Sequence, residues 1–261
     1  MSEKNIKEEI IKKAKDLGID EIGFSLHEGK TAVCCLFPYY HNDGKEANIS
    51  MYARGRDYHL VAKEKLSSLL SPFTDSFELR VDTGPADNVE VAIKSGLGVM
   101  GKNRLLINEN LGSYFFIGYA LTDLEIAPDV PKGGTCLSCN RCLISCPGGA
   151  LTGDGFKLDN CASHISQKKG DLTEEEIKIF RKSKLIWGCD ICQEVCPMNK
   201  VPLKSMVEFE KDRIPTLKKE DLENLSNKEF AEKYKARAFA WRGKAPLLRN
   251  IDLSKNSCLT L

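Results

Sequence analysis

Residues 136–147 read CLSCNRCLISCP, and residues 189–197 read CDICQEVCP. The first stretch has the C-x2-C-x2-C-x3-C-P spacing of bacterial ferredoxins, in which the fourth cysteine ligates the other of two iron–sulfur clusters. The second stretch repeats the C-x2-C-x3-C-P ending but lacks the first cysteine of a complete run. Cys161 is the nearby cysteine that can complete it. Thiolate ligation of metal is therefore predicted to organise this part of the chain.

These cysteines sort into two complete sets if the clusters exchange their fourth ligands. Two-residue gaps let a tight loop aim three thiolates at one cube, while the cysteine before the proline points away. One set is Cys136, Cys139, Cys142 and Cys196, and the other is Cys146, Cys161, Cys189 and Cys192. The alternative is a pair of zinc sites, because C-x2-C also binds zinc. The paired C-x3-C-P endings favour two [4Fe-4S] clusters.

The composition favours metal ligation over disulfide bonds. The chain has 261 residues, 11 cysteines and a formal net charge of +1. Its first residues, MSEKNIKEEIIKKAKDLG, contain no apolar signal core, and no apolar run is long enough to span a bilayer. Disulfide frameworks belong to short secreted chains. We therefore expect a cytoplasmic protein with no membrane partner, and the near-zero charge gives no general argument for nucleic-acid affinity.

Upstream of the cysteines, the pattern alternates helices and strands. Residues 3–17 have the spacing of an amphipathic helix, and residues 31–37, TAVCCLF, form the continuous apolar run of a buried strand. Cys34 and Cys35 lie in that run and would face opposite ways. They are therefore poor ligands of one metal, and core packing is their expected role.

The predicted fold class is mixed, α+β or mixed α/β, with three contiguous domains. Residues 1–128 are expected to form an N-terminal α/β domain, and a composition shift at APDVPKGGT marks its end. Residues 129–200 are predicted to form a ferredoxin-like domain with two [4Fe-4S] clusters. Residues 201–261 are predicted to form a helical C-terminal extension.

Three further motifs leave alternatives open. GLGVMG at residues 96–101 matches G-x-G-x-x-G, but a dinucleotide site needs a strand before it and a helix after it. The order here is reversed, so a glycine-lined turn against another bulky ligand is the alternative. Asp82, at a strand end, is either a turn-capping residue or a proton donor. The dense polar and aromatic stretch YARGRDYH, residues 52–59, favours ligand contact over a solvated loop.

Six segments together resemble the cobalamin-dependent epoxyqueuosine reductase family. In chain order they are YARGRDYH, VDTGP, SGLGVMGKNRLLIN, GSYFFIGYALTDL, CLSCNRCLISCPGGAL and WGCDICQEVCPMNK. The resemblance covers most of residues 50–200. It implies that residues 1–128 bind a base-off cobalamin, that adjacent clusters reduce it, and that the reaction removes the epoxide oxygen from a modified tRNA anticodon base. Asp82 would protonate the leaving oxygen.

The resemblance also implies where the cofactor is held. The expected cofactor-binding residues are Tyr52, Arg54, Asp57, Tyr58, His59, Gly98, Gly101, Lys102, Asn103 and Ser113. The glycine turn would let the backbone approach a large flat ring. No D-x-H-x-x-G stretch is present, so no protein histidine is expected to ligate cobalt. An external donor such as ferredoxin or flavodoxin would supply electrons.

The C-terminal segment determines the expected partner. Family members usually continue past LLRN into a helical repeat domain that helps to hold tRNA, whereas this chain reads LLRNIDLSKNSCLTL and stops, as a short form. RNA contact would then fall to a basic stretch with interleaved aromatics. That stretch contains Lys233, Lys235, Arg237, Phe239, Trp241, Arg242, Lys244 and Arg249. A solvated helix that packs its aromatics on the core is the alternative.

Two other functions remain open from the sequence. One is a corrinoid iron–sulfur reductase that acts on a small molecule or on another corrinoid protein. The other is a simple two-cluster electron carrier, which predicts no corrinoid and gives residues 1–128 no role.

Overall fold

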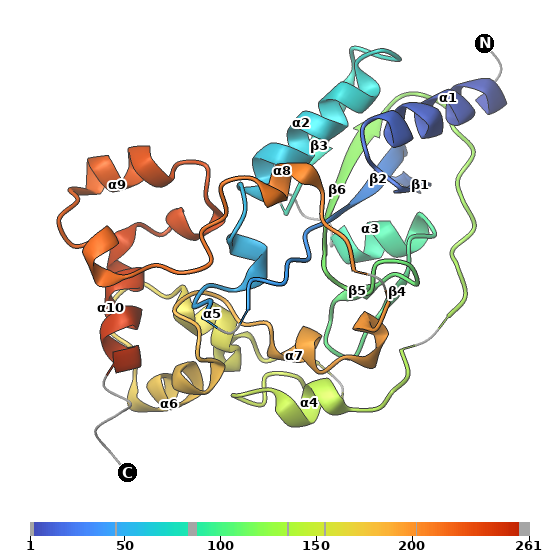
Figure 1. The fold of residues 1–261 in the computed structure, drawn as a ribbon. Helices are drawn as coiled ribbons and strands as arrows, with labels where there is room; N and C mark the ends of the chain where they lie inside the picture. Colours follow the sequence, from blue (N-terminus) through green and yellow to red (C-terminus); the bar gives the residue numbers. More distant parts are fainter. Residues whose placement is uncertain are drawn as a thin grey trace. The chain divides into compact units, whose positions relative to one another are not determined.

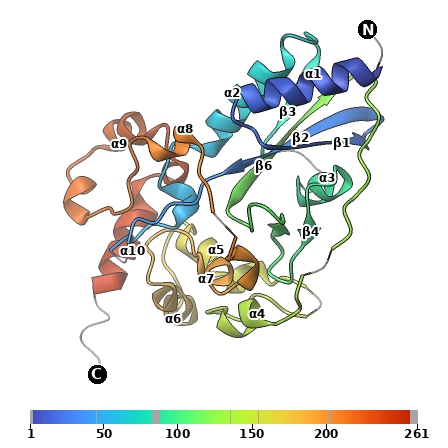
Figure 2. The same cartoon turned by 45° about the vertical axis from the view of Figure 1, so that its right-hand side comes forward.

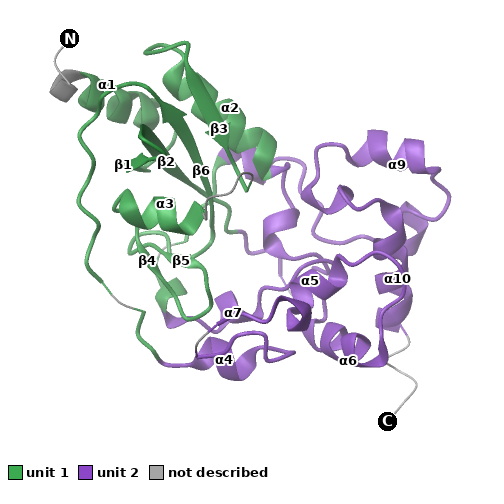
Figure 3. Cartoon of the chain, turned by 180° about the vertical axis from the view of Figure 1, so that it is seen from behind, with its two compact units in different colours: residues 1–40, 58–138, 198–206 green, residues 41–57, 139–197, 207–261 purple. Residues whose placement is uncertain are grey.

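The computed structural model, drawn in two views in Figure 1 and Figure 2, describes residues 3–44, 46–82, 88–134, 136–153, 155–201 and 203–255. The chain divides into two compact units, coloured separately in Figure 3. The first contains residues 1–40, 58–138 and 198–206, and the second contains residues 41–57, 139–197 and 207–261. Each unit therefore combines three chain segments and does not follow the contiguous boundaries predicted near residues 128 and 200.

An antiparallel sheet with the strand order β1-β2-β6-β3 forms the centre of the first unit. Its strands are β1 (Glu21–His27), β2 (Lys30–Pro38), β3 (Phe77–Arg80) and β6 (Phe115–Thr122). The apolar run of β2 lies between β1 and β6, where Cys34 pairs with Tyr119 and Cys35 with Gly118. Because every pairing in this sheet is antiparallel, the unit is α+β and not a parallel α/β layer.

Helices cover both faces of this sheet. They are α1 (Glu3–Asp16), α2 (Tyr58–Leu70) and α3 (Asn88–Lys94). The α3 helix packs with Cys34 on one face, while Leu66 of α2 reaches Gly118 on the other. Both Cys34 and Cys35 are fully buried, which confirms their expected role in the core. Burial raises the pKa of both thiols, so neither is a ready thiolate.

A separate two-stranded ladder joins β4 (Val99–Met100) to β5 (Leu106–Ile107). A turn follows β5 on the way to β6, and Asn108 and Gly112 bridge within it. β5 nevertheless pairs back to β4 instead of joining the main sheet.

Short helices build the second unit. They are α4 (Arg141–Ser145), α5 (Ala162–Ser166), α6 (Glu174–Ser183), α7 (Ile191–Glu194), α8 (Val207–Glu210), α9 (Asn227–Tyr234) and α10 (Lys244–Lys255). The 3-10 turns of the chain are η1 (Met51–Ala53), η2 (Leu158–Asn160), η3 (Pro197–Asn199), η4 (Lys219–Asp221) and η5 (Ala238–Ala240). Capping boxes at Thr173 and Ser226 begin α6 and α9.

The C-terminal helices belong to the same unit as the cysteine motifs. A small core of Ile165, Leu172 and Phe180 packs against Leu253 of α10. Residues 207–255 are thus part of this unit and not a separate extension. Within the described ranges, no helix combines the length and the apolar character needed to cross a bilayer.

Candidate functional site

Four of the predicted thiol ligands come together in the second unit. Cys146 follows α4, Cys161 precedes α5, and Cys189 lies just before α7, which contains Cys192. Burial, with smaller contributions from Asp190 and the thiols of Cys161 and Cys146, raises the pKa of Cys189 to about 12. Burial raises the pKa of Cys192 as well, and the other three thiols add to that shift. The set sorted to the second cluster therefore converges from three separate segments.

This thiol set fits an iron–sulfur cube chemically. Four like groups in a desolvated site resist ionisation, and bound metal cations favour the thiolate form. The backbone N–H of Ala150 donates to Sγ of Cys146 at 3.3 Å, and hydrogen bonds to sulfur are one means of tuning cluster potentials. Among the described residues, no three His, Cys, Asp or Glu side chains converge tightly enough to hold a single metal ion.

The other predicted thiol set is divided between the units. Cys139, Cys142 and Cys196 belong to the second unit, where α4 packs against α7, and Cys136 belongs to the first. Cys142 is buried, whereas Cys139 is exposed. The joint ligation of one cluster by these four residues stays a prediction.

Asp82 is exposed and lies just beyond β3 in a left-handed backbone conformation, with φ 48°. The Tyr58 hydroxyl donates to Oδ2 of Asp82, and Nδ2 of Asn88 donates to Oδ1 at 3.1 Å. Aspartate is one of the few residue types that tolerate this conformation. The two donors thus fix the direction of the Asp82 carboxylate. Residues 83–87, which include the remainder of VDTGP, lie outside the described residues.

Stacked rings hold Tyr58 in place. Its ring lies 4.1 Å from that of Phe116, with 4° between the planes, and 4.1 Å from that of His59. The sequence indicated Tyr58 and His59 but missed Phe116 and Asn88. Phe116 lies in an apolar strand and Asn88 at a helix start, and neither setting marks a residue as part of a site.

The glycine motif at residues 96–101 follows α3 and contains β4, so a helix precedes it, the reverse of a dinucleotide fingerprint, as expected. A Cβ on Gly98 would lie 2.3 Å from the carbonyl oxygen of Ile107, and a Cβ on Gly101 would lie 2.4 Å from Oδ1 of Asn103. These glycines are therefore needed for the close packing of the β4–β5 ladder itself.

Asn103 carries an unsatisfied donor beside this ladder. Its Oδ1 accepts from Leu105 N–H at 3.3 Å, whereas its Nδ2 is buried and has no partner among the described residues. The residue is 5 % exposed. A buried N–H group without an acceptor is costly, so this atom is suited to an acceptor on a bound ligand.

Ser113 is held within the first unit. Its backbone N–H donates to Oδ1 of Asn199 at 2.7 Å, and its hydroxyl also contacts the Asn199 side chain. Sequence reasoning did not single out Asn199, which lies two residues after Pro197 at the end of the second cysteine motif.

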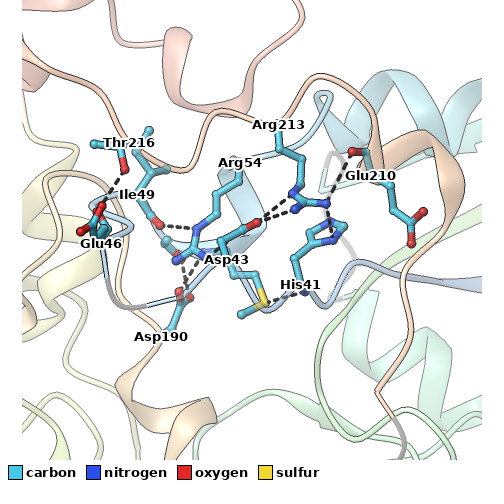
Figure 4. Close-up of polar contacts among 11 residues, drawn as sticks. His41, Asp43, Glu46, Ile49, Arg54, Asp190, Glu210, Arg213 and Thr216 are labelled. Carbon is cyan, nitrogen blue, oxygen red and sulfur yellow. Dashed lines mark hydrogen bonds and ion pairs between the residues drawn. The ribbon is translucent and has the colours of Figure 1, made fainter.

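Three other predicted cofactor contacts belong to the second unit. Arg54 lies in the charged network of Figure 4, where its Nε donates to the Ile49 carbonyl at 2.7 Å and its Nη1 pairs with Asp43 at 3.2 Å. Asp43 also pairs with Arg213 at 2.5 Å. The Asp57 N–H donates to the carbonyl of Ala236, and Tyr52 lies against Gly188. The stretch YARGRDYH is thus divided between the units, and Arg54 anchors its first half.

Most of the basic stretch makes internal contacts. Arg237 donates to the Asp212 carbonyl at 2.5 Å, and Arg249 donates to the Lys168 carbonyl at 2.8 Å. Lys244 donates to the carbonyl of Leu225, Lys235 pairs with Glu232, and Lys233 lies over the Tyr234 ring. Phe239 is fully buried.

One aromatic–basic pair of this stretch lies at the surface. Trp241 is 62 % exposed, and the Arg242 guanidinium lies 3.7 Å from its ring centroid. The expected basic face with interleaved aromatics is therefore reduced to this stacked pair.

Two family models match the chain. One, described as "4Fe-4S double cluster binding domain", matches residues 135–199 and confirms the prediction of two [4Fe-4S] clusters. The other, described as "Epoxyqueuosine reductase QueG, DUF1730", matches residues 22–83.

Relatives and solved structures agree with these matches. An epoxyqueuosine reductase of Lactococcus garvieae (strain Lg2) is 34 % identical over 95 % of this chain and 86 % of its own length. One of Listeria monocytogenes is 36 % identical over 79 % of this chain, and the match spans 57 % of its length.

Two solved epoxyqueuosine reductases cover 97 % of this chain, each with a TM-score of 0.84. The Bacillus subtilis enzyme, with the loop of its catalytic aspartate swung out of the active site, is 28 % identical and 82 % covered. An enzyme with an epoxyqueuosine-modified stem loop of tyrosine tRNA is 29 % identical and 81 % covered. This chain therefore belongs to the epoxyqueuosine reductase family.

Proposed function

We propose that this chain reduces epoxyqueuosine in tRNA to queuosine in the cytoplasm, using its two [4Fe-4S] clusters and a base-off cobalamin. The observation that carries the proposal is the Asp82 carboxylate, oriented by Tyr58 and Asn88 beyond the end of β3. This is the position at which the family resemblance requires an acid. The activity named for the relatives supports the same assignment.

The reaction takes two electrons and two protons, breaks the bonds to the epoxide oxygen, and yields an alkene and water. An external donor such as ferredoxin or flavodoxin would supply the electrons, and the clusters, held by the cysteine motifs, would supply one-electron transfer. Cobalamin, when bound, supplies the cobalt chemistry that couples them to carbon–oxygen cleavage. The carboxyl group of Asp82, which is exposed, donates a proton to the leaving oxygen.

The first unit offers a polar group that fits cobalamin. The rim of a corrin ring carries amide side chains whose carbonyl oxygens accept hydrogen bonds, and the buried Nδ2 of Asn103 has no acceptor among the residues that the structure describes. We assign Asn103 to such an amide, with Lys102 and the turn at Gly98 and Gly101 beside it. The contacts predicted for Tyr58, His59 and Ser113, which lie in the same unit, are proposed with it.

Asn103→Ala is expected to weaken cobalamin binding by roughly 2- to 10-fold, the effect of one neutral hydrogen bond. Titration of cobalamin into anaerobic protein, followed by its absorbance, measures this. Exposed Asn110 supplies the matched control, Asn110→Ala, which should bind normally. Electron paramagnetic resonance of the Co(II) form should lack nitrogen superhyperfine splitting from a lower ligand. Such splitting, or unchanged affinity in Asn103→Ala, would contradict the assignment.

The stacked Trp241–Arg242 pair, in which Trp241 is exposed and Arg242 is half-buried, gives the proposed tRNA contact a specific test. Stacking on an aromatic ring is worth about 1–3 kcal/mol per base, so Trp241→Ala should weaken tRNA binding by about 5- to 150-fold. Arg242→Glu should reduce the magnitude of the slope of log affinity against log salt concentration by about one, the contribution of one phosphate contact. Lys12→Glu, at an exposed position of α1, is the charge-reversal control. Unchanged affinity and salt slope in both variants would leave the pair without a role in RNA binding.

The activity itself is tested by anaerobic incubation with epoxyqueuosine-containing tRNA, a strong reductant and cobalamin. Conversion of the modified nucleoside to queuosine, measured by mass spectrometry of digested tRNA, is the expected result. No conversion by a protein with full clusters and reducible cobalamin would instead favour a reductase of a small molecule or of another corrinoid protein.

A further inference from the structure

Hydrogen bonds join the three segments that carry the second thiol set. The Asn160 side chain donates from Nδ2 to the Gly148 carbonyl at 3.1 Å, which ties the segment after Cys146 to the one before Cys161. The backbone N–H of Gly188 donates to the Ser166 hydroxyl at 2.9 Å. Ser166 ends α5, which begins after Cys161, and Gly188 directly precedes Cys189.

Asp190 ties this cysteine loop to a segment far away in the sequence. Its Oδ1 accepts from the Ser50 hydroxyl, and its Oδ2 accepts from the Met51 N–H at 2.8 Å. Asp190 is 3 % exposed and Ser50 is fully buried. The Ser50 N–H donates in turn to the carbonyl of Trp187 at 2.8 Å.

The segment of Ser50 packs so closely against Gly188 that no side chain would fit between them. Gly188 has φ 76°, and a Cβ there would lie 2.3 Å from Cβ of Ser50. Arg54, close to Asp190 in Figure 4, interacts electrostatically with it and is fixed by its own ion pair with Asp43. The segment that carries Ser50 and Met51 is therefore itself firmly anchored.

Asn250 makes the corresponding tie from α10. Its Nδ2 donates to the carbonyls of Ser166 and Ile186, both at 2.7 Å, and the residue is fully buried. The Asn250 amide thus links the end of α5 to Ile186, which lies three residues before Cys189. Neighbouring Arg249 adds donations to the carbonyls of Lys168 and Gly170.

We propose that Asp190 and Asn250 are positioning residues of the second cluster. They hold the segments of Cys161, Cys189 and Cys192 at the spacing a cube requires, without ligating iron. The inference rests on the proposed sorting of Cys146, Cys161, Cys189 and Cys192 to one cluster. Because both ties reach outside residues 129–200, the ferredoxin-like segment depends on residues 41–57 and on α10 to keep this cluster.

Asn250→Ala and Asp190→Ala, made in the full chain and purified anaerobically, test the proposal. Iron and sulfide should fall from about eight to about four per chain, the loss of one cube. The electron paramagnetic resonance signal of the remaining cluster should persist in the reduced protein. Asn227→Ala and Asp252→Ala, at exposed positions of the same unit, are matched controls that should retain all iron.

Asp190→Asn separates positioning from charge. Its amide oxygen can accept from Met51 N–H while its NH₂ donates to the Ser50 hydroxyl oxygen, which restores both ties. We expect this variant to keep about eight irons, as two cubes require. Iron loss in Asp190→Asn equal to that in Asp190→Ala would overturn the positioning role of Asp190.

Other outcomes also count against the inference. Full iron content in both alanine variants would refute it. Equal loss of both clusters, with far-ultraviolet circular dichroism unchanged, would refute its restriction to the second cluster. Because every readout concerns iron, the proposal can fail while the tRNA reaction is confirmed, and the reverse also holds.

Discussion

Asp82→Asn is expected to reduce the rate of epoxyqueuosine reduction by about 10²–10⁴-fold, the usual contribution of a positioned general acid. Asparagine has nearly the same shape and can still bond one of the two donors that orient Asp82, Tyr58 or Asn88. It has no acidic proton to give to the leaving oxygen. Single-turnover conversion by anaerobic protein loaded with cobalamin measures the loss, and iron content and cobalamin affinity should be unchanged.

Two variants make this result specific. Asp123→Asn changes another exposed aspartate of the first unit, one that pairs with Lys30, and should leave the rate unchanged. Tyr58→Phe removes the hydroxyl that donates to Asp82 but keeps the stack on Phe116. The loss of rate in Tyr58→Phe should be smaller than that in Asp82→Asn, because the Asp82 carboxyl group remains. Near-normal turnover in Asp82→Asn would reduce Asp82 to a turn residue that tolerates a positive φ.

Local patterns predicted the elements of this fold well. The run TAVCCLF is a buried strand, and residues 3–17 contain a helix, because periodicity and apolar content act on neighbouring residues. The cysteine motifs could be recognised in the same way, because their spacing also involves only neighbouring residues. The packing of distant segments into the two units was not predicted. Ser50 and Asp190, for example, are hydrogen-bonded although they are 140 positions apart, and a local sequence pattern carries no information about such a contact.

The site was predicted unevenly for the same reason. The role of Asp82 stays a prediction from its strand-end position and the family resemblance, whereas Asn88, which orients its carboxylate, has no distinguishing sequence context. Arg54 was expected to contact the cofactor because of the family resemblance, and Arg249 was expected to contact RNA as part of the basic stretch. In the structure both side chains donate hydrogen bonds to backbone carbonyls. A guanidinium has several N–H donors, which can bond backbone carbonyls within the protein as well as a ligand.

Cys161→Ala is expected to remove the second cluster while sparing most of the first. Two [4Fe-4S] clusters require about eight irons and eight sulfides in the wild-type protein, and the variant should retain about four of each. Cys161 lies at the N-cap of α5, but its side chain makes no capping hydrogen bond. The substitution therefore removes a thiolate without removing a helix cap, so iron loss reports ligation and not unfolding of α5.

A buried cysteine outside the motifs supplies the control. Cys35→Ala, in β2 of the first unit, removes the thiol of a buried core residue outside the cysteine motifs and should therefore keep all the iron. Iron and sulfide analysis with electron paramagnetic resonance of the reduced proteins compares the two variants. Equal iron in Cys161→Ala and wild type would remove Cys161 from the ligand set and break the sorting into two sets of four. Stoichiometric zinc without iron in anaerobically prepared wild-type protein would contradict the assignment of both clusters. The C-x2-C spacing alone can bind either zinc or an iron–sulfur cluster. The assignment of clusters therefore rests on the paired C-x3-C-P endings and on the family match.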